Sequence, residues 1–296
     1  MGKNGQNIQF SLGNMKIDSH QHFWQYNPVK HNWIDDEMSA IRKDFLPQDL
    51  FSILQQNNIN GTVAVQADQT EAETNFLIDL AANNSFIKGV VGWVDLKADN
   101  IQERLLHYKK HNVVKGFRHI LQNEEPDFMT DKKFLRGIAA LKEFNFTYDI
   151  LIFPKHLLAA IELVKRNPNQ LFVIDHIAKP YIKSGLIAEW KKGIETIAQF
   201  DNVYCKISGM VTETDYKVWQ QKDFTPYLHF VVNAFGTKRI MFGSDWPVCS
   251  VSASYQQVLT IPHNYFSCFS QSEQNDFFGN NAIKFYQLYI HLCQHQ

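Results

Sequence analysis

Short apolar runs, rich in β-branched residues, recur along the chain and are separated by longer stretches with helical spacing. Continuous apolar runs of this kind are typical of parallel strands that are buried on both faces. The pattern predicts eight strands, near residues 15–18, 61–66, 87–94, 114–118, 147–152, 171–174, 203–208 and 239–242.

Helices are predicted in the gaps between these strands. Phe76, Leu77 and Leu80 share one helical face, and Pro47 stands where a first turn would begin. The predicted helices span 47–57, 71–82, 100–110, 131–143, 155–166, 185–199, 225–235 and 254–260, with 271–278 and 282–288 after the last strand. Eight alternations of strand and helix predict an α/β fold, a single-domain (β/α)₈ TIM barrel over residues 15–296.

A doubly wound open sheet is the structural rival of the barrel. Such sheets usually carry a glycine-rich phosphate turn after the first strand, where this chain has His20-Gln21-His22. The segment 24–45 is long for a loop between strand and helix and is rich in aromatic and charged residues. We interpret it as an insertion that covers the barrel mouth, with an irregular surface loop as the alternative.

The composition of the chain argues against binding to nucleic acid or to a membrane. The chain is 45% hydrophobic and 20% charged, with a formal net charge of −1 and no basic run, so neither nucleic acid nor an anionic membrane surface is indicated as a partner. No apolar run reaches the roughly 18 residues of a membrane span. Residues 1–14 are polar and lack the apolar core of a signal peptide, which predicts a loose arm.

The four cysteines do not suggest a disulfide framework. They are Cys205, Cys249, Cys268 and Cys293, and none forms a CxxC pair. Reduced thiols and a cytoplasmic location are therefore expected.

Candidate chemistry lies where the predicted strands end, because those ends meet at one mouth of a barrel. His20 and His22 are two apart, so their side chains share one face of an extended strand. Neutral imidazole can bind a metal or polarise a carbonyl. The other polar or aromatic residues at strand ends are Gln66, Trp93, Arg118, His119, Gln122, Asp149, Asp175, His176, Lys179, Lys206, Ser208, Ser244, Asp245 and Trp246.

Several of these residues have a plain structural alternative. Trp93 and Trp246 would lie either against a ligand or in the core. Asp175 is expected to face away from His176, because neighbours alternate along a strand. His156 follows Pro154, so we expect it to begin a helix, face solvent and lie outside the site.

Five motifs together resemble the amidohydrolase-related (amidohydrolase 2) family. They are HxH at 20–22, GFRHILQ at 116–122, DHIAKP at 175–180, KISG at 206–209 and FGSDWPV at 242–248. The sequence is most similar to the sugar-lactone hydrolases of the L-fuconolactonase and L-rhamnonolactonase type, over about residues 15–290. The resemblance implies a barrel of the metal-dependent-hydrolase kind with hydrolysis at its C-terminal rim.

The resemblance also implies a metal site of one ion or none. His20, His22, His176 and Asp245 match ligands of the wider superfamily. Tyr148-Asp149-Ile150-Leu151 stands where a strand-five histidine would be, and Arg118-His119 stands where a bridging group would be. A binuclear site is therefore not expected. One Zn²⁺-like ion is compatible with the sequence, and so is metal-independent hydrolysis, as in related pyrone-dicarboxylate lactonases.

These residues suggest a mechanism for opening a small-molecule sugar lactone. Asp245 would act as general base on water, and His20, His22 and His176 would polarise the carbonyl directly or through the metal. Arg118, His119, Lys179 and Gln66 would hold the substrate, with Trp93 and Trp246 against its ring. A metal-dependent decarboxylase of the same family is the alternative enzyme, and a sugar-binding barrel without activity is the alternative outside enzymology.

Overall fold

All eight predicted strands are present and form one parallel sheet, in which each strand pairs with the next along the chain. The computed structural model describes residues 14–289. The predicted arm over 1–14 and Cys293 fall almost wholly outside that range. The strands are β1 (Ile17–Gln21), β2 (Gly61–Val65), β3 (Ile87–Gly92), β4 (Val114–His119), β5 (Thr147–Ile150), β6 (Phe172–Ile174), β7 (Val203–Ile207) and β8 (Ile240–Phe242).

The sheet closes into a barrel just beyond the end of β8. The amide of Asp245 donates to the carbonyl of His20 at 2.8 Å, and the amide of His22 donates to the carbonyl of Trp246 at 2.7 Å. These bonds join the first strand to the segment after the last one, so the predicted (β/α)₈ barrel is confirmed. They also hold His20, His22 and Asp245 side by side at the mouth.

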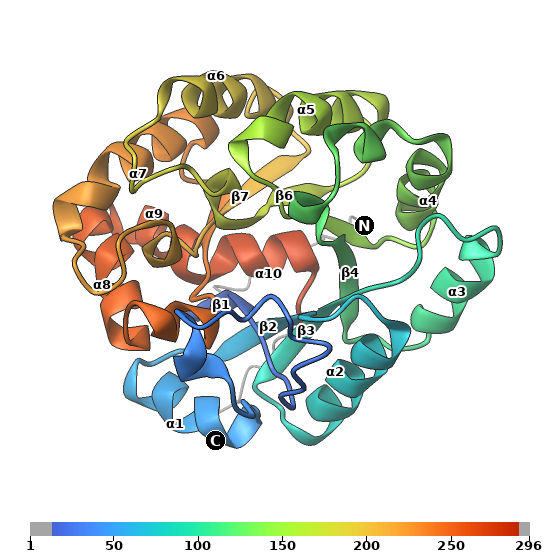
Figure 1. Cartoon of the computed structure of the whole chain (residues 1–296), viewed down its shortest axis with the longest axis horizontal. Helices are drawn as coiled ribbons and strands as arrows, with labels where there is room; N and C mark the ends of the chain where they lie inside the picture. Colours follow the sequence, from blue (N-terminus) through green and yellow to red (C-terminus); the bar gives the residue numbers. More distant parts are fainter. Residues whose placement is uncertain (1–13, 290–296) are drawn as a thin grey trace, which may run out of the picture.

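Helices α1 to α8 surround the barrel in the order of the chain, as Figure 1 shows, and α10 lies across it. With their bounds, the ten α-helices of residues 14–289 are α1 (Pro47–Gln56), α2 (Glu71–Asn83), α3 (Ile101–Tyr108), α4 (Lys132–Glu143), α5 (Leu157–Arg166), α6 (Ala188–Ile197), α7 (Gln221–Phe235), α8 (Tyr255–Phe266), α9 (Gln271–Asn275) and α10 (Asn281–Tyr286). In the part of the chain that the structure describes, no helix is both long enough and apolar enough to cross a bilayer. Cys205, Cys249 and Cys268 are free thiols.

Several predicted boundaries differ from the structure: α8, for example, continues to Phe266 rather than ending at residue 260, and α6 spans Ala188–Ile197 rather than 185–199. Two of the differences have identifiable reasons. The first strand runs to Gln21 rather than to residue 18, because its pairing with β2 continues after a register shift between Asp18 and Gln21. Such irregularities are common beside active sites. Helix α7 begins at Gln221 rather than at residue 225, because the carboxylate of Asp223 accepts a hydrogen bond from the amide of Gln220 and caps an earlier turn.

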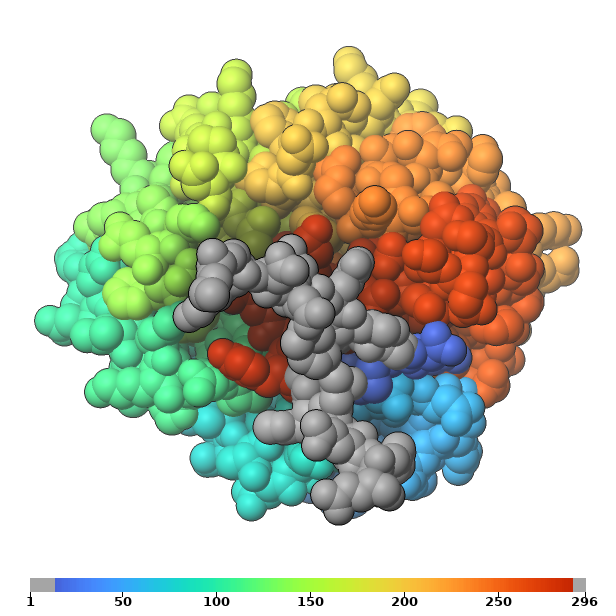
Figure 2. Space-filling model, turned by 180° about the vertical axis from the view of Figure 1, so that it is seen from behind, coloured from blue at the N-terminus to red at the C-terminus, as the bar shows by residue number. Residues whose placement is uncertain are grey.

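The barrel interior changes from apolar to charged toward the mouth. Along β7, the alternate side chains Tyr204, Lys206 and Ser208 follow one another upward. At the lower end, an apolar cluster of inward side chains includes Val173, Tyr204 and Met241 and packs against α10. Helix α10 therefore acts as a floor, seen across the barrel in Figure 1. Figure 2 shows the molecule from behind, with red atoms of the last part of the chain near the middle of that face.

The segment 24–45 covers part of the mouth, as predicted. Its two ends are paired, since the amide and carbonyl of Trp24 each bond the backbone of Phe45 at 2.9 Å. Trp24 and Phe45 meet edge to face, and Phe45 meets Trp246 in the same way. Between these ends, Trp33 and Met38 face the pocket at the mouth.

Candidate active site

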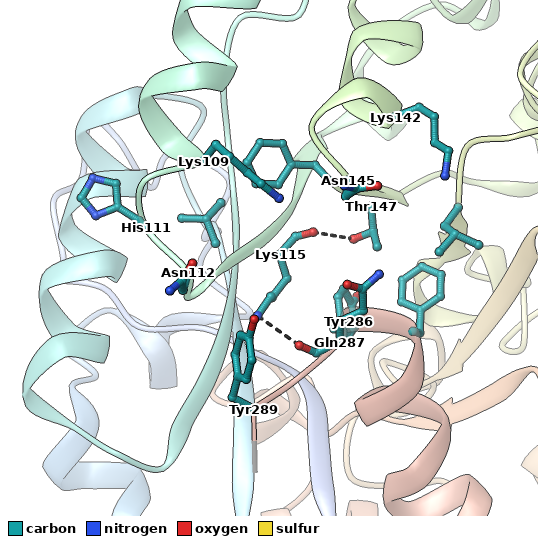
Figure 3. A pocket seen from close by; sticks show the side chains of 14 residues that line it. Lys109, His111, Asn112, Lys115, Lys142, Asn145, Thr147, Tyr286, Gln287 and Tyr289 are labelled. Carbon is teal, nitrogen blue, oxygen red and sulfur yellow. Dashed lines mark hydrogen bonds between the residues drawn. The ribbon is translucent and has the colours of Figure 1, made fainter. Parts of the chain in front are cut away.

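The barrel carries a pocket at each end, and only one of them gathers catalytic groups. The lower pocket contains Lys109, Lys115 and Lys142 (Figure 3). Lys109 donates to the carbonyl of Phe144 at 2.7 Å and Lys115 to that of Gln287 at 3.1 Å, which are the carbonyls that end α4 and α10. Cations at helix C-termini satisfy free carbonyls and oppose the helix dipole, so two of these lysines have a structural role.

The upper pocket, hereafter the mouth pocket, lies at the C-terminal ends of the strands. It encloses about 1080 Å³, part of it open to solvent. Its walls combine apolar and aromatic side chains with a similar number of polar and charged ones, and such a concave pocket with convergent polar groups is the usual form of a small-molecule site. The lining residues are His22, Trp33, Met38, Ala67, Arg118, Ile120, Gln122, Asn123, Leu151, Phe153, His176, Lys179, Thr212, Glu213, Tyr216, Asp245 and Val248.

His20 and His22 point the same way, as their spacing predicts. Their Nε2 atoms lie 3.1 Å apart. Nδ1 of His22 donates to the carbonyl of Val65 at 2.8 Å, which leaves Nε2 of that ring with a free lone pair. His20 is fully buried, and burial lowers its pKa well below the usual value, so its ring is neutral at neutral pH.

His176 reaches the same place through an unusual backbone. Residues 176–179 all have positive φ, from 45° to 59°, so the chain makes a left-handed turn directly after Asp175. Gly209 lies against the ring, and a Cβ there would come within 2.5 Å of Nδ1 of His176. Nδ1 also lies 2.9 Å from Oγ of Ser208. Burial lowers the pKa of His176 to about 4, so this ring is neutral as well.

Asp245 faces all three imidazoles. Its Oδ1 lies 3.3 Å from Nε2 of His22 and 3.8 Å from Nε2 of both His20 and His176. Burial acts to raise the pKa of Asp245, but the surrounding imidazoles of His176, His22 and His20 favour its ionised form more strongly and hold the pKa below its usual range. A carboxylate that is ionised and almost buried therefore stands at the centre of the site.

A balanced charged layer lies directly beneath these groups. Nζ of Lys206, fully buried, is 2.6 Å from Asp149 and 3.0 Å from Asp175. Arg118 pairs with Asp175 at 3.0 Å and donates to Oε1 of Gln66 at 2.7 Å. The two cations, Lys206 and Arg118, thus neutralise the two carboxylates of this layer. Among residues 14–289, no lysine or arginine nitrogen lies within 4 Å of the Asp245 carboxylate.

The donor set fits a single divalent metal ion. Ligand atoms of His20, His176 and Asp245 lie within 4.8 Å of one another, and Nε2 of His22 adjoins two of them. Imidazole nitrogens with one carboxylate oxygen are ligands that Zn²⁺ prefers. Nδ1 of His22 bonds the carbonyl of Val65, and Nδ1 of His176 bonds Oγ of Ser208. These hydrogen bonds fix the orientation of both rings.

Two expectations about neighbouring residues were wrong. Asp175 does not lie apart from His176: Asp175 Oδ1 is 3.3 Å from Nδ1 of His20, and the His176 ring is 4.4 Å from the His20 ring. The left-handed turn directs the side chain of His176 into the site, although alternation along the strand would send the neighbour of Asp175 outward. His156 is not exposed either, since it is buried and its Nε2 bonds the carbonyl of Glu124 at 3.0 Å.

The predicted substrate-binding residues do not all line the mouth pocket. Arg118 and Lys179 do, whereas Gln66 lies behind Arg118. The indole N–H of Trp93 donates to Nδ1 of His119 at 3.2 Å, and Nε2 of His119 lies 2.9 Å from a carboxylate oxygen of Glu124. Trp93, His119 and Glu124 therefore form a cluster of their own. Trp246 packs among aromatic rings, and its ring centroid lies 6.1 Å from that of Phe23 and 5.3 Å from that of Phe45.

Other residues of the site carried no sequence signal. Asp149 was noted only as a strand end, yet it anchors Lys206 and accepts a hydrogen bond from Tyr286 of α10 at 2.8 Å. Glu213 and Trp33 lie in irregular segments, where periodicity says nothing about direction. Lys206 and Lys179, the partners of Asp149 and Glu213, lie on distant segments, and no local pattern could have indicated these pairs.

Comparison with known proteins agrees with this geometry. The model of the Amidohydro_2 family, described as amidohydrolase, matches residues 17–288. An L-fucono-1,5-lactonase from Burkholderia multivorans is 34% identical over 289 residues, covering 94% of this chain and 97% of that protein. An L-rhamnono-gamma-lactonase from Scheffersomyces stipitis is 24% identical and covers 60% of each chain.

A solved structure is similar over almost the whole chain. It is that of an amidohydrolase from Burkholderia multivorans with bound zinc. It superimposes with a TM-score of 0.90 at 35% identity, covering 93% of this chain and 100% of that one.

Proposed function

Because this chain belongs to the Amidohydro_2 amidohydrolase family, we propose that it hydrolyses a sugar-acid lactone to the aldonic acid. Lactones of the L-fuconic and L-rhamnonic type are the proposed substrates, in line with the names of two relatives. The observation that carries the proposal is the ionised carboxylate of Asp245 facing three imidazoles in a pocket of small-molecule size.

Asp245 is the proposed general base. A water molecule between its carboxylate and the lactone carbonyl loses a proton to Asp245 as its oxygen bonds the carbonyl carbon. The ring C–O bond then breaks, and the leaving ring oxygen takes the proton from Asp245. The products are a free carboxylic acid, which ionises, and a hydroxyl on the same chain.

The imidazoles act on the carbonyl oxygen, where negative charge develops. His20, His22 and His176 would stabilise that charge directly wherever the ring nitrogen that faces the oxygen carries a proton, and through a bound ion where that nitrogen holds a lone pair, as Nε2 of His22 does. A divalent ion, held by these three histidines and Asp245, would supply Lewis-acid stabilisation of that oxygen. Arg118 and Lys179 border the pocket and remain proposed substrate-binding residues. Lys179 would donate to the sugar hydroxyls, whereas Arg118, held by Gln66 and Asp175, would support the pocket wall. His119, Gln66, Trp93 and Trp246 remain proposed as supporting residues.

A pH-indicator assay of acid release tests the proposal. We expect release from L-fucono-1,5-lactone or an L-rhamnono-lactone, and Asp245→Asn should lower kcat by about 10²–10⁴-fold with an unchanged circular dichroism spectrum. Asp215→Asn, an exposed carboxylate paired with Lys183, is the matched control. No release from any sugar lactone would reject the function, and full activity in Asp245→Asn would reject this base.

The same assay with a chelator separates the two ways of polarising the carbonyl. Loss of activity that added zinc restores would assign that task to a bound ion. Activity that survives complete metal removal would assign it to the imidazoles themselves. Metal content measured beside activity keeps the two results distinct.

A further inference from the structure

Among residues 14–289, the arginine and the lysine that line the mouth pocket are both paired with other protein groups, so neither is free for an anionic substrate. Two cations and two carboxylates border it, namely Arg118, Lys179, Glu213 and Asp245. The guanidinium of Arg118 is occupied by Gln66 and Asp175. Nζ of Lys179 lies 3.7 Å from Oε1 of Glu213, and both side chains are mostly buried.

Two uncharged residues that line the same pocket each have a polar atom with unmet hydrogen-bonding capacity. The indole N–H of Trp33 and Oε1 of Gln122 are buried and find no partner within the described part of the chain. Buried polar atoms without partners are rare in native proteins. One of these groups can only donate and the other can only accept, which together match what a hydroxyl group offers.

Apolar side chains form the rest of the wall. Met38, Leu151, Phe153 and Val248 face the pocket. Such surfaces suit the C–H faces of a sugar ring or an exocyclic methyl group, and they offer nothing to a charged substituent.

On the basis of the proposed function, we propose that the mouth pocket selects uncharged, polyhydroxylated lactones and rejects lactones that carry a carboxylate. Glu213 is the charge filter, because it neutralises Lys179 and presents its own negative charge beside Asp245. Trp33 and Gln122 are the hydroxyl-recognising residues. Specificity here arises from a repulsive element together with two attractive ones.

The charge filter is tested with lactones that share one ring configuration. The five-membered lactones of L-fuconic and L-galactonic acid, and the enantiomer of galactaric acid monolactone with the same configuration, end their exocyclic carbon chain in a methyl, hydroxymethyl or carboxylate group. We expect wild-type kcat/KM to be at least about tenfold lower for the carboxylated lactone than for the better neutral one. Equal values would overturn the inference and leave the proposed function standing, whereas no turnover of any lactone would overturn both.

Glu213→Gln should reverse the discrimination. Freed from its partner, Lys179 becomes an anion receptor, and the ratio of kcat/KM for carboxylated over neutral lactone should rise about tenfold or more. Asp215→Asn removes a carboxylate from the exposed Lys183–Asp215 pair outside the pocket and should leave the ratio unchanged. An unchanged ratio in a folded Glu213→Gln variant would overturn the role of Glu213.

Hydroxyl recognition is tested with lactones that each lack one ring hydroxyl. Trp33→Phe and Gln122→Leu should each raise KM for the full lactone about three- to tenfold, the size of one neutral hydrogen bond. Each variant should also lose its preference over one particular deoxy lactone. Trp219→Phe is the control, because its indole N–H already bonds the carbonyl of Ser252 outside the mouth pocket. Variants that keep the wild-type preference for every hydroxyl would overturn the assignment.

Discussion

Nδ1 of His176 lies 2.9 Å from Oγ of Ser208, so a side chain from the end of β7 orients the imidazole that follows β6. The backbone at His176 lies in a left-handed turn. Apart from the contact with Ser208, the ring of His176 is held by packing. The hydroxyl thus fixes the direction in which Nε2 faces Asp245.

Replacement of Ser208 by alanine should weaken catalysis without unfolding the protein. We expect kcat to fall about tenfold or more, as is usual when a group that orients an active-site histidine is lost. Ser208→Thr keeps the hydroxyl and should retain most of the activity. Steady-state kinetics of both variants, with thermal unfolding as the folding control, check this expectation.

Gly209→Ala should disturb the same ring from the other side. The new Cβ would lie 2.5 Å from Nδ1 of His176 at a residue with φ of +59°. Displacement of the ring should reduce kcat strongly, and backbone strain should lower the free energy of unfolding by about 1–3 kcal/mol. Gly185→Ala is a matched control, because φ is +68° there and nothing lies within 4 Å of the added Cβ. If both variants lose activity equally, contact with His176 is not the cause.

Lys206→Met should be severely destabilising. The change leaves Asp149 and Asp175 buried without their cation, and loss of one partner of a buried pair typically lowers unfolding free energy by about 3–5 kcal/mol. Lys183→Met, which breaks an exposed pair, should change stability little. Urea unfolding of the two variants measures the contrast, and similar midpoints would show that the charged layer contributes nothing.

Glu73 should make stability fall as pH rises. Burial raises its pKa to about 7 from 4.5, so the folded state holds a proton that the unfolded state releases. Its stabilising contribution is therefore complete below pH 4.5 and is lost as pH increases through about 7, a change of up to about 3 kcal/mol. Glu73→Gln should be more stable than wild type at about pH 8. Urea unfolding at several pH values tests the slope, which should flatten in the variant.

Zinc should bind once per chain at His20, His22, His176 and Asp245. We expect titration calorimetry of the metal-stripped protein to give one site, and His176→Ala to weaken it at least about tenfold. Added zinc should also raise the unfolding temperature of wild type, because a ligand that binds only the folded state stabilises it. Wild-type affinity in His176→Ala would remove that residue from the ligand set.

Strand order and helix positions could be predicted because they depend on local apolar periodicity. The motif residues His20, His22, His176 and Asp245 were also predicted to converge, and their side chains do meet. That prediction needed only the rule that the strand ends of a barrel share one mouth.

The directions of side chains outside regular strands could not be predicted. Asp175 and His176 both face the site because a left-handed turn overrides alternation, and no common sequence pattern announces such a turn in residues other than glycine. The burial of Lys206 and His156 depends on partners on distant segments, such as Asp149 and the carbonyl of Glu124. Long-range partners of this kind are invisible to local reasoning.

The floor helix α10 has a consequence for how this protein is made. Tyr286 reaches up from it to the carboxylate that anchors Lys206, so one of the final helical residues completes the hydrogen bonding of the charged interior. A nascent chain that has emerged only as far as β8 still lacks that seal, and water can enter from below. Maturation of the catalytic centre must therefore wait until translation has passed the tenth helix.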